Sequence, residues 1–441
     1  MCLFSRRSPQ SRSALRTLPA VSALAATVFA VLAAGAAHAA PTFKRLHAFC
    51  LPSDCKGGNH PQSALLLDSD GNLYGTTSSG GSHGYGLVFK FIPNGDKSKY
   101  GEHVIHTFCA KDPPNCTDGS TPDSDLIMDT AGNLYGTAAN GGKKCCGIVY
   151  RLTPNGTGWS FTVLHNFGAD DGTYPEAGLT YAGQASGAPW DGSSPLYGTT
   201  SGGGQYVAGI AYQLVHSGST WPLTVIHNFH SAGDPGPLLM DASGNLFGTA
   251  AVGGVYEGGL MYKLAGKTWK QTILRNFCKE ADCADGEGPS GRLLMDASGN
   301  LFGTTVYGGS NDGGVIFKRT AGGSYKVIHN FSYDSDQNPV AGLLMDASGN
   351  LFGTTFGGGF HGDDACSGGN FGAGCGAVFE QTAAGQHIAL YQFCATYHCP
   401  DGANPAAALA MDKNGYLYGS TTLGGNDDNG RTGGTIFRIQ R

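Results

Sequence analysis

Acidic and polar side chains follow a proline that recurs along the chain. The recurring prolines are Pro61, Pro122, Pro175, Pro235, Pro289, Pro339 and Pro405. Gln62, Asp123 and Glu176 directly follow the first three prolines, and Asp125 and Arg292 lie three residues after the second and the fifth. Asp123 and Glu176 could act as a general acid and base or hold a divalent metal. Because no nearby histidine completes such a site, we favour solvated loop acids here, and we expect no catalytic residue, metal or cofactor.

Two further patterns resemble functional motifs but recur too often to be single sites. One position in each repeat is filled by histidine five times, at His47, His106, His165, His227 and His329. A catalytic base is needed only once, so we interpret these histidines as packing residues. The run from Asp68 to Asn72 has the alternating oxygen ligands of a calcium loop but lacks the distal glutamate of an EF-hand. We interpret its copies as hairpin turns.

The cysteines occur as near neighbours in the sequence. Thirteen are present, and Cys2 lies in a segment that we expect to be removed, which leaves twelve. An even number in an exported chain indicates disulfides, although sequence alone does not fix the connectivity. Zinc is a weaker alternative, because no Cys-x2-Cys pair occurs. The adjacent Cys145 and Cys146 could form a strained vicinal disulfide, and the sequence leaves this open. The disulfide candidates are Cys50, Cys55, Cys109, Cys116, Cys278, Cys283, Cys366, Cys375, Cys394 and Cys399.

The elements that must position these residues are copies of one unit. A stretch with the pattern Leu-(Tyr/Phe)-Gly-(Thr/Ser) occurs seven times, with its glycine at Gly75, Gly136, Gly198, Gly248, Gly303, Gly353 and Gly419. In the sixth unit, residues 342–346, 350–355, 376–379 and 387–393 indicate four short strands, and Asp-x-x-Gly-Asn predicts a hairpin between the first two. Seven such units predict an all-β fold, a seven-bladed β-propeller of four-stranded blades. The third unit replaces its hairpin with an insertion at residues 184–194, which we interpret as surface decoration.

The two ends of the chain are out of phase with the repeat. Residues 43–49 match the fourth strand of later units, whereas the chain ends at residues 434–439, which match a third strand. We therefore predict that the N-terminal strand pairs with the C-terminal blade and closes the ring, since closure removes exposed sheet edges.

The order of strands places the long connections at one end of the ring. The loops between blades and the loops between the second and third strands share this end and carry the cysteines, while short turns occupy the other. Binding sites favour elaborated loops on a rigid scaffold. The two longest such loops, in the sixth and seventh units, contain the candidate binding residues His361, Asp363, Asp364, Asp427, Asp428 and Arg431.

The N-terminus has the features of a secretory signal. Four arginines precede an apolar run at residues 18–37, and Ala-His-Ala follows at 37–39. We expect residues 1–39 to be the signal and residues 40–441 the propeller domain. Of the 27 basic residues, four lie in the signal, which leaves 23 against 33 acidic residues and a formal charge of −10. This balance argues against nucleic acid and anionic membranes as partners. We expect a secreted monomer, extracellular or periplasmic, with no membrane span in the mature chain.

The repeat also resembles a known family. Leu-Leu-Met-Asp-Ala-Ser-Gly-Asn-Leu-Phe-Gly-Thr-Thr, then Gly-Val-Ile-Phe-Lys and Val-Ile-His-Asn-Phe, resembles the GloVer-type tandem repeat of secreted bacterial choice-of-anchor proteins, over residues 43–441. The resemblance implies an exported propeller-like array of unknown biochemical activity. A weaker similarity to sensor propellers and streptogramin lyases carries over no site residue. We therefore expect a binding module for an extracellular glycan or protein ligand on the disulfide-bonded loop end. The alternative is a lyase or lactonase with its site at the channel mouth.

Overall fold

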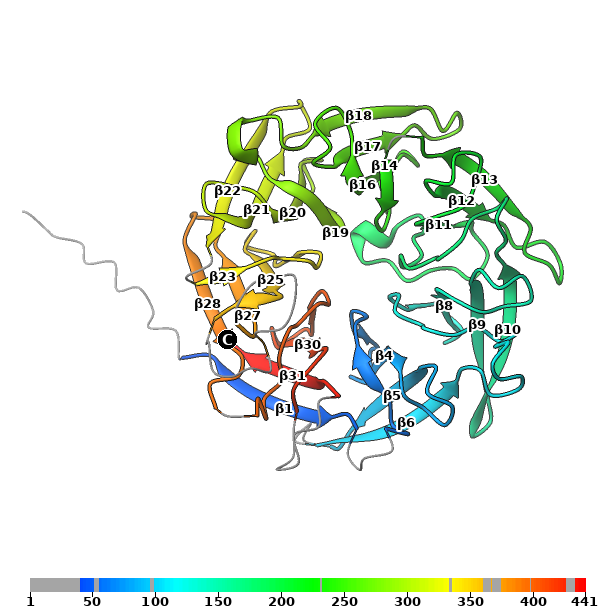
Figure 1. Ribbon diagram of the computed structural model, residues 1–441. Helices are drawn as coiled ribbons and strands as arrows, with labels where there is room; N and C mark the ends of the chain where they lie inside the picture. The colour runs from blue at the N-terminus through cyan, green and yellow to red at the C-terminus, as the bar shows by residue number, and fades with distance from the viewer. Residues whose placement is uncertain are drawn as a thin grey trace, which may run out of the picture. The chain divides into compact units, whose positions relative to one another are not determined.

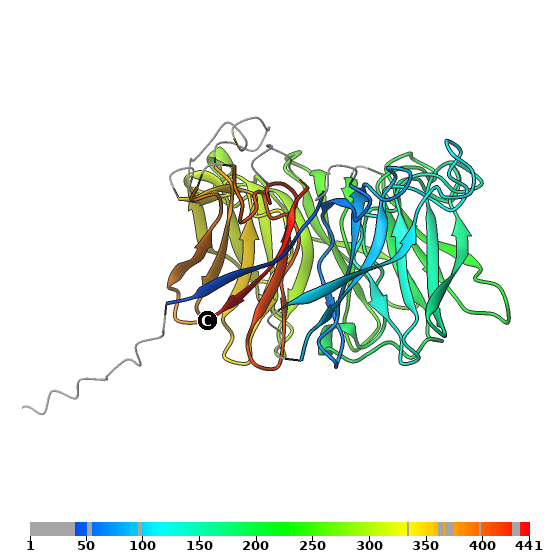
Figure 2. The same ribbon diagram turned by 90° about the horizontal axis from the view of Figure 1, so that it is seen from below.

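In the computed structural model, the chain folds as a seven-bladed β-propeller over the residues that the structure describes (Figure 1). These are residues 40–50, 55–95, 99–230, 232–332, 335–359, 366, 374–396, 398–425 and 433–441. The blades are small antiparallel sheets that follow one another around a ring, and a side view shows the strands running between its two ends (Figure 2). Among these residues, no helix combines the length and apolarity that a membrane crossing requires.

The strands are short and occur in blade order. Blade 1 contains β2 (Asn59–Pro61), β3 (Leu66–Leu67), β4 (Leu73–Ser79), β5 (Leu87–Pro93) and β6 (Tyr100–Thr107). Blade 2 contains β7 (Ile127–Met128), β8 (Leu134–Ala138), β9 (Ile148–Asn155) and β10 (Gly158–Asn166). Blade 3 contains β11 (Leu196–Thr200), β12 (Ile210–Leu214) and β13 (Leu223–Asn228). Blade 4 contains β14 (Ala232–Pro235), β15 (Leu239–Met240), β16 (Leu246–Gly253), β17 (Leu260–Leu264) and β18 (Gln271–Asn276).

The remaining blades follow the same order. Blade 5 contains β19 (Glu287–Met295), β20 (Leu301–Tyr307), β21 (Asp312–Arg319) and β22 (Tyr325–Ser332), and its sheet continues into β23 (Asp336–Gln337) and β26 (Gly357–Gly358). Blade 6 contains β24 (Leu344–Met345), β25 (Leu351–Thr355), β27 (Ala377–Gln381) and β28 (His387–Gln392). Blade 7 contains β29 (Ala410–Met411), β30 (Leu417–Thr421), β31 (Thr435–Gln440) and, from the other end of the chain, β1 (Thr42–Ala48). Two short 3₁₀ turns, η1 (Gln184–Ser186) and η2 (Ala281–Cys283), lie in connections.

The predicted closure of the ring is confirmed. β1 pairs antiparallel with β31, from Thr42 opposite Gln440 to Ala48 opposite Thr435. The amide of His60 then donates to the carbonyl of Gly433 at 3.0 Å, which joins blade 1 to blade 7. The two ends of the chain thus hold one blade together, and blade 7 presents no unpaired outer strand.

Blade 3 differs from the predicted four-stranded pattern. Its sheet has three strands, and its innermost segment contributes only two isolated pairs, Thr173 with Gly202 and Thr180 with Tyr197. The reason is the insertion at residues 184–194, which takes the place of the tight Asp-x-x-Gly-Asn turn. In the other six blades the turn aspartate accepts the backbone amides two and four residues later, which fixes the hairpin.

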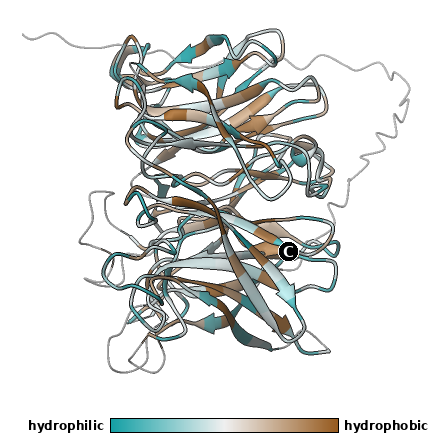
Figure 3. Cartoon of the chain, turned by 90° about the vertical axis from the view of Figure 1, so that its right-hand side faces the viewer, coloured by the Kyte–Doolittle hydropathy of each residue, from teal (hydrophilic) through white to brown (hydrophobic). Residues whose placement is uncertain are grey.

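The hydrophobic core lies between neighbouring blades. One cluster joins Val88 and Phe108 of blade 1 to Leu134 and Ile148 of blade 2, and each later pair of blades has an equivalent cluster. Hydrophobic colour follows many of the strands, while turns and loops are largely hydrophilic or neutral (Figure 3). Burial of this apolar surface favours stacking of each blade on the next.

The repeated glycine of the second strand makes room for an aromatic ring of the third strand. A Cβ added at Gly303 would lie 2.6 Å from Cζ of Phe317 and 2.9 Å from Cδ2 of Leu293. The same conflict, with Phe or Tyr, occurs at the equivalent glycine of every blade. Only glycine therefore lets the two strands approach with the ring between them.

A second close contact joins each blade to the next. A glycine with positive φ opens the third strand, and the recurring proline of the following blade lies against it. An added Cβ would approach the proline Cδ to between 2.4 and 3.3 Å in all seven cases. The glycine–proline pairs are Gly86 with Pro122, Gly147 with Pro175, Gly209 with Pro235, Gly259 with Pro289, Gly314 with Pro339, Gly376 with Pro405, and Gly434 with Pro61.

We expect Gly303→Ala to lower the free energy of unfolding by about 1–3 kcal/mol, because the new methyl group overpacks the contact with Phe317. Gly322→Ala is the matched control, since its added Cβ would be 3.9 Å from the nearest atom on an exposed turn. Urea unfolding of both variants measures the difference. Equal stability of the two variants would contradict this account of the repeated glycine.

Candidate functional site

Three carboxylates lie at the start of the innermost segments of blades 2, 3 and 4. Asp123 and Glu176 directly follow the recurring proline, as the sequence indicated, whereas Asp234 directly precedes it. Burial, and to a smaller extent the charge of Glu176, raise the pKa of Asp123 to about 7. Burial and the charge of Asp234 raise the pKa of Glu176, and burial raises that of Asp234. These three residues, the mouth acids, are therefore electrostatic neighbours around the axis at the loop end.

A small hollow of about 180 Å³ adjoins two of the mouth acids. Glu176 and Asp234 line it together with Ser201 and Ser290. Near Asp123, the buried hydroxyl of Tyr150 and Oδ1 of Asp123 have no hydrogen-bond partner among the described residues. Carboxyls that hold a proton near neutral pH can donate a hydrogen bond or act as general acids. Within the described part of the chain, the mouth acids are not among the groups that bring three ligand atoms within 4.8 Å of one another.

Arg292 and Asp125, which we expected at the mouth, form a polar bridge across the inside of the ring. The Arg292 guanidinium donates to the side chains of Thr180 and Gln184 at 3.1 and 2.8 Å, and to the carbonyls of Leu238 and Leu179 at 3.0 and 3.3 Å. Its Nη2 lies 4.0 Å from Oδ2 of Asp125.

The other carboxylate oxygen of Asp125 accepts the amide of Ala64 at 2.8 Å. Arg292 and Asp125 therefore tie blades 1 to 5 together, and their polar groups are engaged within the protein. Gln62, by contrast, is exposed.

The candidate binding residues of the two longest loops, His361, Asp363, Asp364, Asp427, Asp428 and Arg431, lie outside the described residues.

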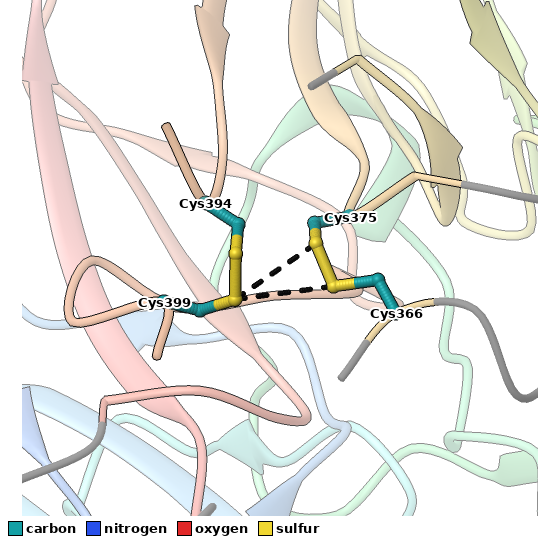
Figure 4. Close-up of side chains that lie close together, drawn as sticks. All are labelled: Cys366, Cys375, Cys394 and Cys399. Carbon is teal, nitrogen blue, oxygen red and sulfur yellow. Dashed lines mark hydrogen bonds between the residues drawn. A yellow bond between two sulfur atoms is a disulfide. The ribbon is translucent and has the colours of Figure 1, made fainter. Parts of the chain in front are cut away.

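Disulfides cross-link the loops at the loop end of the ring. The bonded pairs are Cys50–Cys55, Cys109–Cys116, Cys278–Cys283, Cys366–Cys375 and Cys394–Cys399. The last two pack together, with Sγ of Cys399 3.9 Å from that of Cys375 and 4.0 Å from that of Cys366 (Figure 4).

Four buried sulfurs this close also match a zinc ligand set if all four were thiolates. The same five-residue separation forms a disulfide at Cys50–Cys55 and at Cys278–Cys283. We therefore treat Cys394–Cys399 as the disulfide that the repeat places between blades, with Cys366–Cys375 packed on it.

The recurring histidines occupy one structural position. Each of the five packs edge-on against the phenylalanine two residues later, with ring centroids 4.7 to 4.9 Å apart. Burial lowers the pKa of both His47 and His329 to about 4. All five rings therefore act as packing groups in the outer strands.

A large hollow lies at the turn end, opposite the end that we expected to bind. This turn-end cleft has a volume of about 1140 Å³. Its walls are the hairpin turns of blades 1 and 2, the outer strands of blade 1, and the insertion of blade 3. Half-buried Trp159 and exposed Ile92 and Val104 contribute apolar surface. The carboxylates of Asp68 and Asp129 also line it, but both accept hydrogen bonds within their own hairpins.

The blade 3 insertion is an anchored part of the fold and not simply surface decoration, as we had interpreted it. Its Trp190 is 1% exposed and packs edge-on against Tyr135 of blade 2, with centroids 4.6 Å apart. The carbonyl of Trp190 accepts the amide of Thr130 at 3.1 Å, and Gln184 contacts Arg292 inside the ring. The sequence does indicate that the insertion is anchored, because Trp190 is one of four tryptophans and lies where the repeat breaks.

Comparison with known proteins identifies one matching family and several solved structures of low sequence identity. The Gloeobacter/Verrucomicrobia repeat matches residues 25–188 and 184–366. No curated protein matches the chain.

Among solved structures, two proteins provisionally named as 6-phosphogluconolactonases resemble it. The one from Bacteroides fragilis is 14% identical, with a TM-score of 0.47 over 78% of this chain and 86% of its own. The one from Bacteroides uniformis is 13% identical, with a TM-score of 0.46 over 75% and 84%. A gluconolactonase from Xanthomonas campestris is 11% identical, with a TM-score of 0.38 over 67% and 82%. Structural similarity at this level gives no information about the activity of this chain.

We expect Asp123→Asn to stabilise the protein in a pH-dependent way. Folding raises the pKa of this carboxyl from 3.8 to about 7, so the folded state holds the proton more tightly than the unfolded state does. The favourable contribution of the Asp123 carboxyl to the free energy of unfolding is therefore complete below pH 3.8, and it is lost as the pH rises towards 7. The Tm gain of the variant over wild type should grow across this window and stay constant above it.

Thermal melts at several pH values measure this gain, with exposed Asp70→Asn as the control. A gain that does not change with pH would contradict the assignment of a buried, protonated carboxyl.

We expect Arg292→Met to lower the free energy of unfolding by about 2–4 kcal/mol, because it leaves buried oxygens of blades 3 and 4 without their donor and Asp125 without its ion-pair partner. Lys326→Met, on an exposed position of β22, removes a positive charge without such contacts and serves as the control. Chemical unfolding compares the two variants, and a loss below about 1 kcal/mol for Arg292→Met would show that the bridge is dispensable.

Proposed function

The chain belongs to the Gloeobacter/Verrucomicrobia repeat family, and we propose that it is an exported binding module whose turn-end cleft holds an extracellular glycan. The observation that carries the proposal is the position of the insertion in blade 3. Where the sequence departs from its own hairpin repeat, one wall of the turn-end cleft is formed by Tyr181, Gln184, Gly187 and Pro189. Such a departure makes this region differ from the other blades, and sites on rigid scaffolds concentrate at elaborated loops.

The chemistry of the cleft suits a neutral sugar chain. Trp159 offers an aromatic face, and Ile92 and Val104 extend the apolar surface. Aromatic rings stack on the apolar faces of sugars while polar groups at the rim bind hydroxyls. Asp68 and Asp129 each accept four hydrogen bonds within their own hairpins, so they do not form an acid–base pair in the cleft. The volume of about 1140 Å³ exceeds that of most small-molecule sites and leaves room for more than one sugar ring.

Export is supported by the disulfides. Five of them form within the described residues, and such bonds persist in oxidising compartments outside the cytoplasm. The arginine-rich, apolar N-terminal segment supplies the expected signal.

A second candidate function, a lyase or lactonase, is favoured by one observation, the raised pKa values of the mouth acids. Buried carboxyls with shifted pKa values are enriched at catalytic sites. The described residues around them do not supply a metal ligand set of the kind a metal-dependent lactonase requires. We therefore place this function second, with Asp123 and Glu176 as its candidate acid and base.

We expect Trp159→Ala to weaken glycan binding at least about tenfold, because it removes the aromatic face of the cleft. Trp269→Ala is the matched control: this tryptophan occupies the corresponding turn of blade 4, is also half-buried, and does not line the cleft. A glycan array with the wild-type protein identifies the oligosaccharide, and calorimetric titration of all three proteins measures affinity.

Equal affinities of the three proteins would show that the glycan does not bind in the turn-end cleft. If binding is then lost on shortening the loop at residues 356–375, the loop end is the binding surface. Lactone turnover that disappears in Glu176→Gln would favour the enzyme instead.

A further inference from the structure

Cys145 and Cys146 are held with their sulfur atoms in contact. The two Sγ atoms are 3.0 Å apart, about 1 Å more than a disulfide bond. Cys145 is exposed and Cys146 is partly exposed, so reagents can reach the pair. In an extended strand, neighbouring side chains point to opposite faces and their sulfurs could not meet. The approach therefore depends on the local turn.

The fold imposes this turn, with or without the cysteines. Cys145 has φ of 73°, in the left-handed region, and the equivalent residues Val207, Glu257 and Asp312 have φ of 61°, 60° and 57°. The amide of Cys145 donates to Gly142 at 3.1 Å, and the carbonyl of Cys146 accepts the amide of Tyr174 of the next blade at 3.1 Å. The backbone on both sides of the pair is thus fixed by contacts that recur around the ring.

The proposed export would place the pair in an oxidising compartment. The five disulfides of the described residues lie at the same loop end, and Cys366–Cys375 occupies the equivalent connection between the second and third strands of blade 6. A compartment that keeps these bonds will also oxidise two accessible thiols already in contact.

We propose that Cys145 and Cys146 form a sixth, vicinal disulfide in the folded protein. The step is a thiol–disulfide exchange: two cysteine thiols and one external disulfide, from a protein or a small molecule, give the Cys145–Cys146 bond and two external thiols. The two cysteines lose two electrons and two protons, and the external disulfide gains them.

This modification changes a surface hollow. Cys145 lines a depression of about 610 Å³ together with Tyr85, Asn115 and Asn140. The bond replaces two rotating thiols with a small rigid ring and removes the hydrogen-bond donor of Cys145 from that wall. The proposal does not depend on the glycan function, because it concerns the opposite end of the ring.

The test counts thiols in the purified protein. The full chain is unfolded in guanidinium without reductant, alkylated and digested with trypsin, which releases residues 145–151 between Lys144 and Arg151 as one peptide. We expect that peptide unalkylated and two hydrogen masses lighter than the dithiol form. After reduction it should carry two alkyl groups.

Cys145→Ser is the control, because it leaves one thiol that must be alkylated without reduction and so shows that the reagent reaches Cys146. Two alkyl groups on the unreduced wild-type peptide would overturn the proposal. Linkage of either cysteine to another peptide would overturn it equally, because the partner would then lie elsewhere.

Discussion

One steric contact underlies the whole ring: the proline of each blade lies against a positive-φ glycine of the blade before it. A side chain on any of these seven glycines would approach the proline ring to within 3.3 Å and would also meet backbone oxygens of its own blade. The contact therefore sets the distance between neighbouring blades. This distance is the one allowed by a glycine, which has no side chain, and a proline, which has no amide hydrogen. Because every blade makes the same contact, the angle between blades repeats, and seven repeats bring the last blade next to the first.

Hydrogen bonds support the same spacing on the inner side. Threonine hydroxyls of the second strands donate to carbonyls of the next blade in five of the seven interfaces. At the other two, the hydroxyls of Thr249 and Ser420 have no partner among the described residues. Arg292 of blade 5 completes these inner contacts by donating to groups of blades 3 and 4. This rigid interior leaves the two ends of the ring free to vary, and the disulfides and the mouth acids occupy one end while the turn-end cleft occupies the other.

Local patterns in the sequence predict most of the fold. The repeat predicts seven blades, the phase offset of the ends predicts closure through β1, and the near-neighbour cysteines indicate disulfides. The rest depends on contacts between residues that are distant in sequence. Arg292 is 112 residues from Thr180, and no local pattern indicates that its guanidinium reaches blade 3. The pattern of acidic residues after the recurring proline does not include Asp234, because Asp234 precedes its proline while Asp123 and Glu176 follow theirs. The turn-end cleft could not be predicted, because its wall depends on how Trp190 docks the insertion onto a neighbouring blade.

The central claim is that a sevenfold scaffold gains one glycan site where the blade 3 insertion breaks the repeat. The most direct measurement is a crystal structure of the protein with the oligosaccharide that binds it most tightly. The account predicts a sugar ring stacked on Trp159 between blades 1 and 2, with the wall at Gln184 to Pro189 beside it. A sugar bound instead at the loop end, next to Glu176 and Asp234, would contradict it and would make the mouth acids the functional centre of the ring.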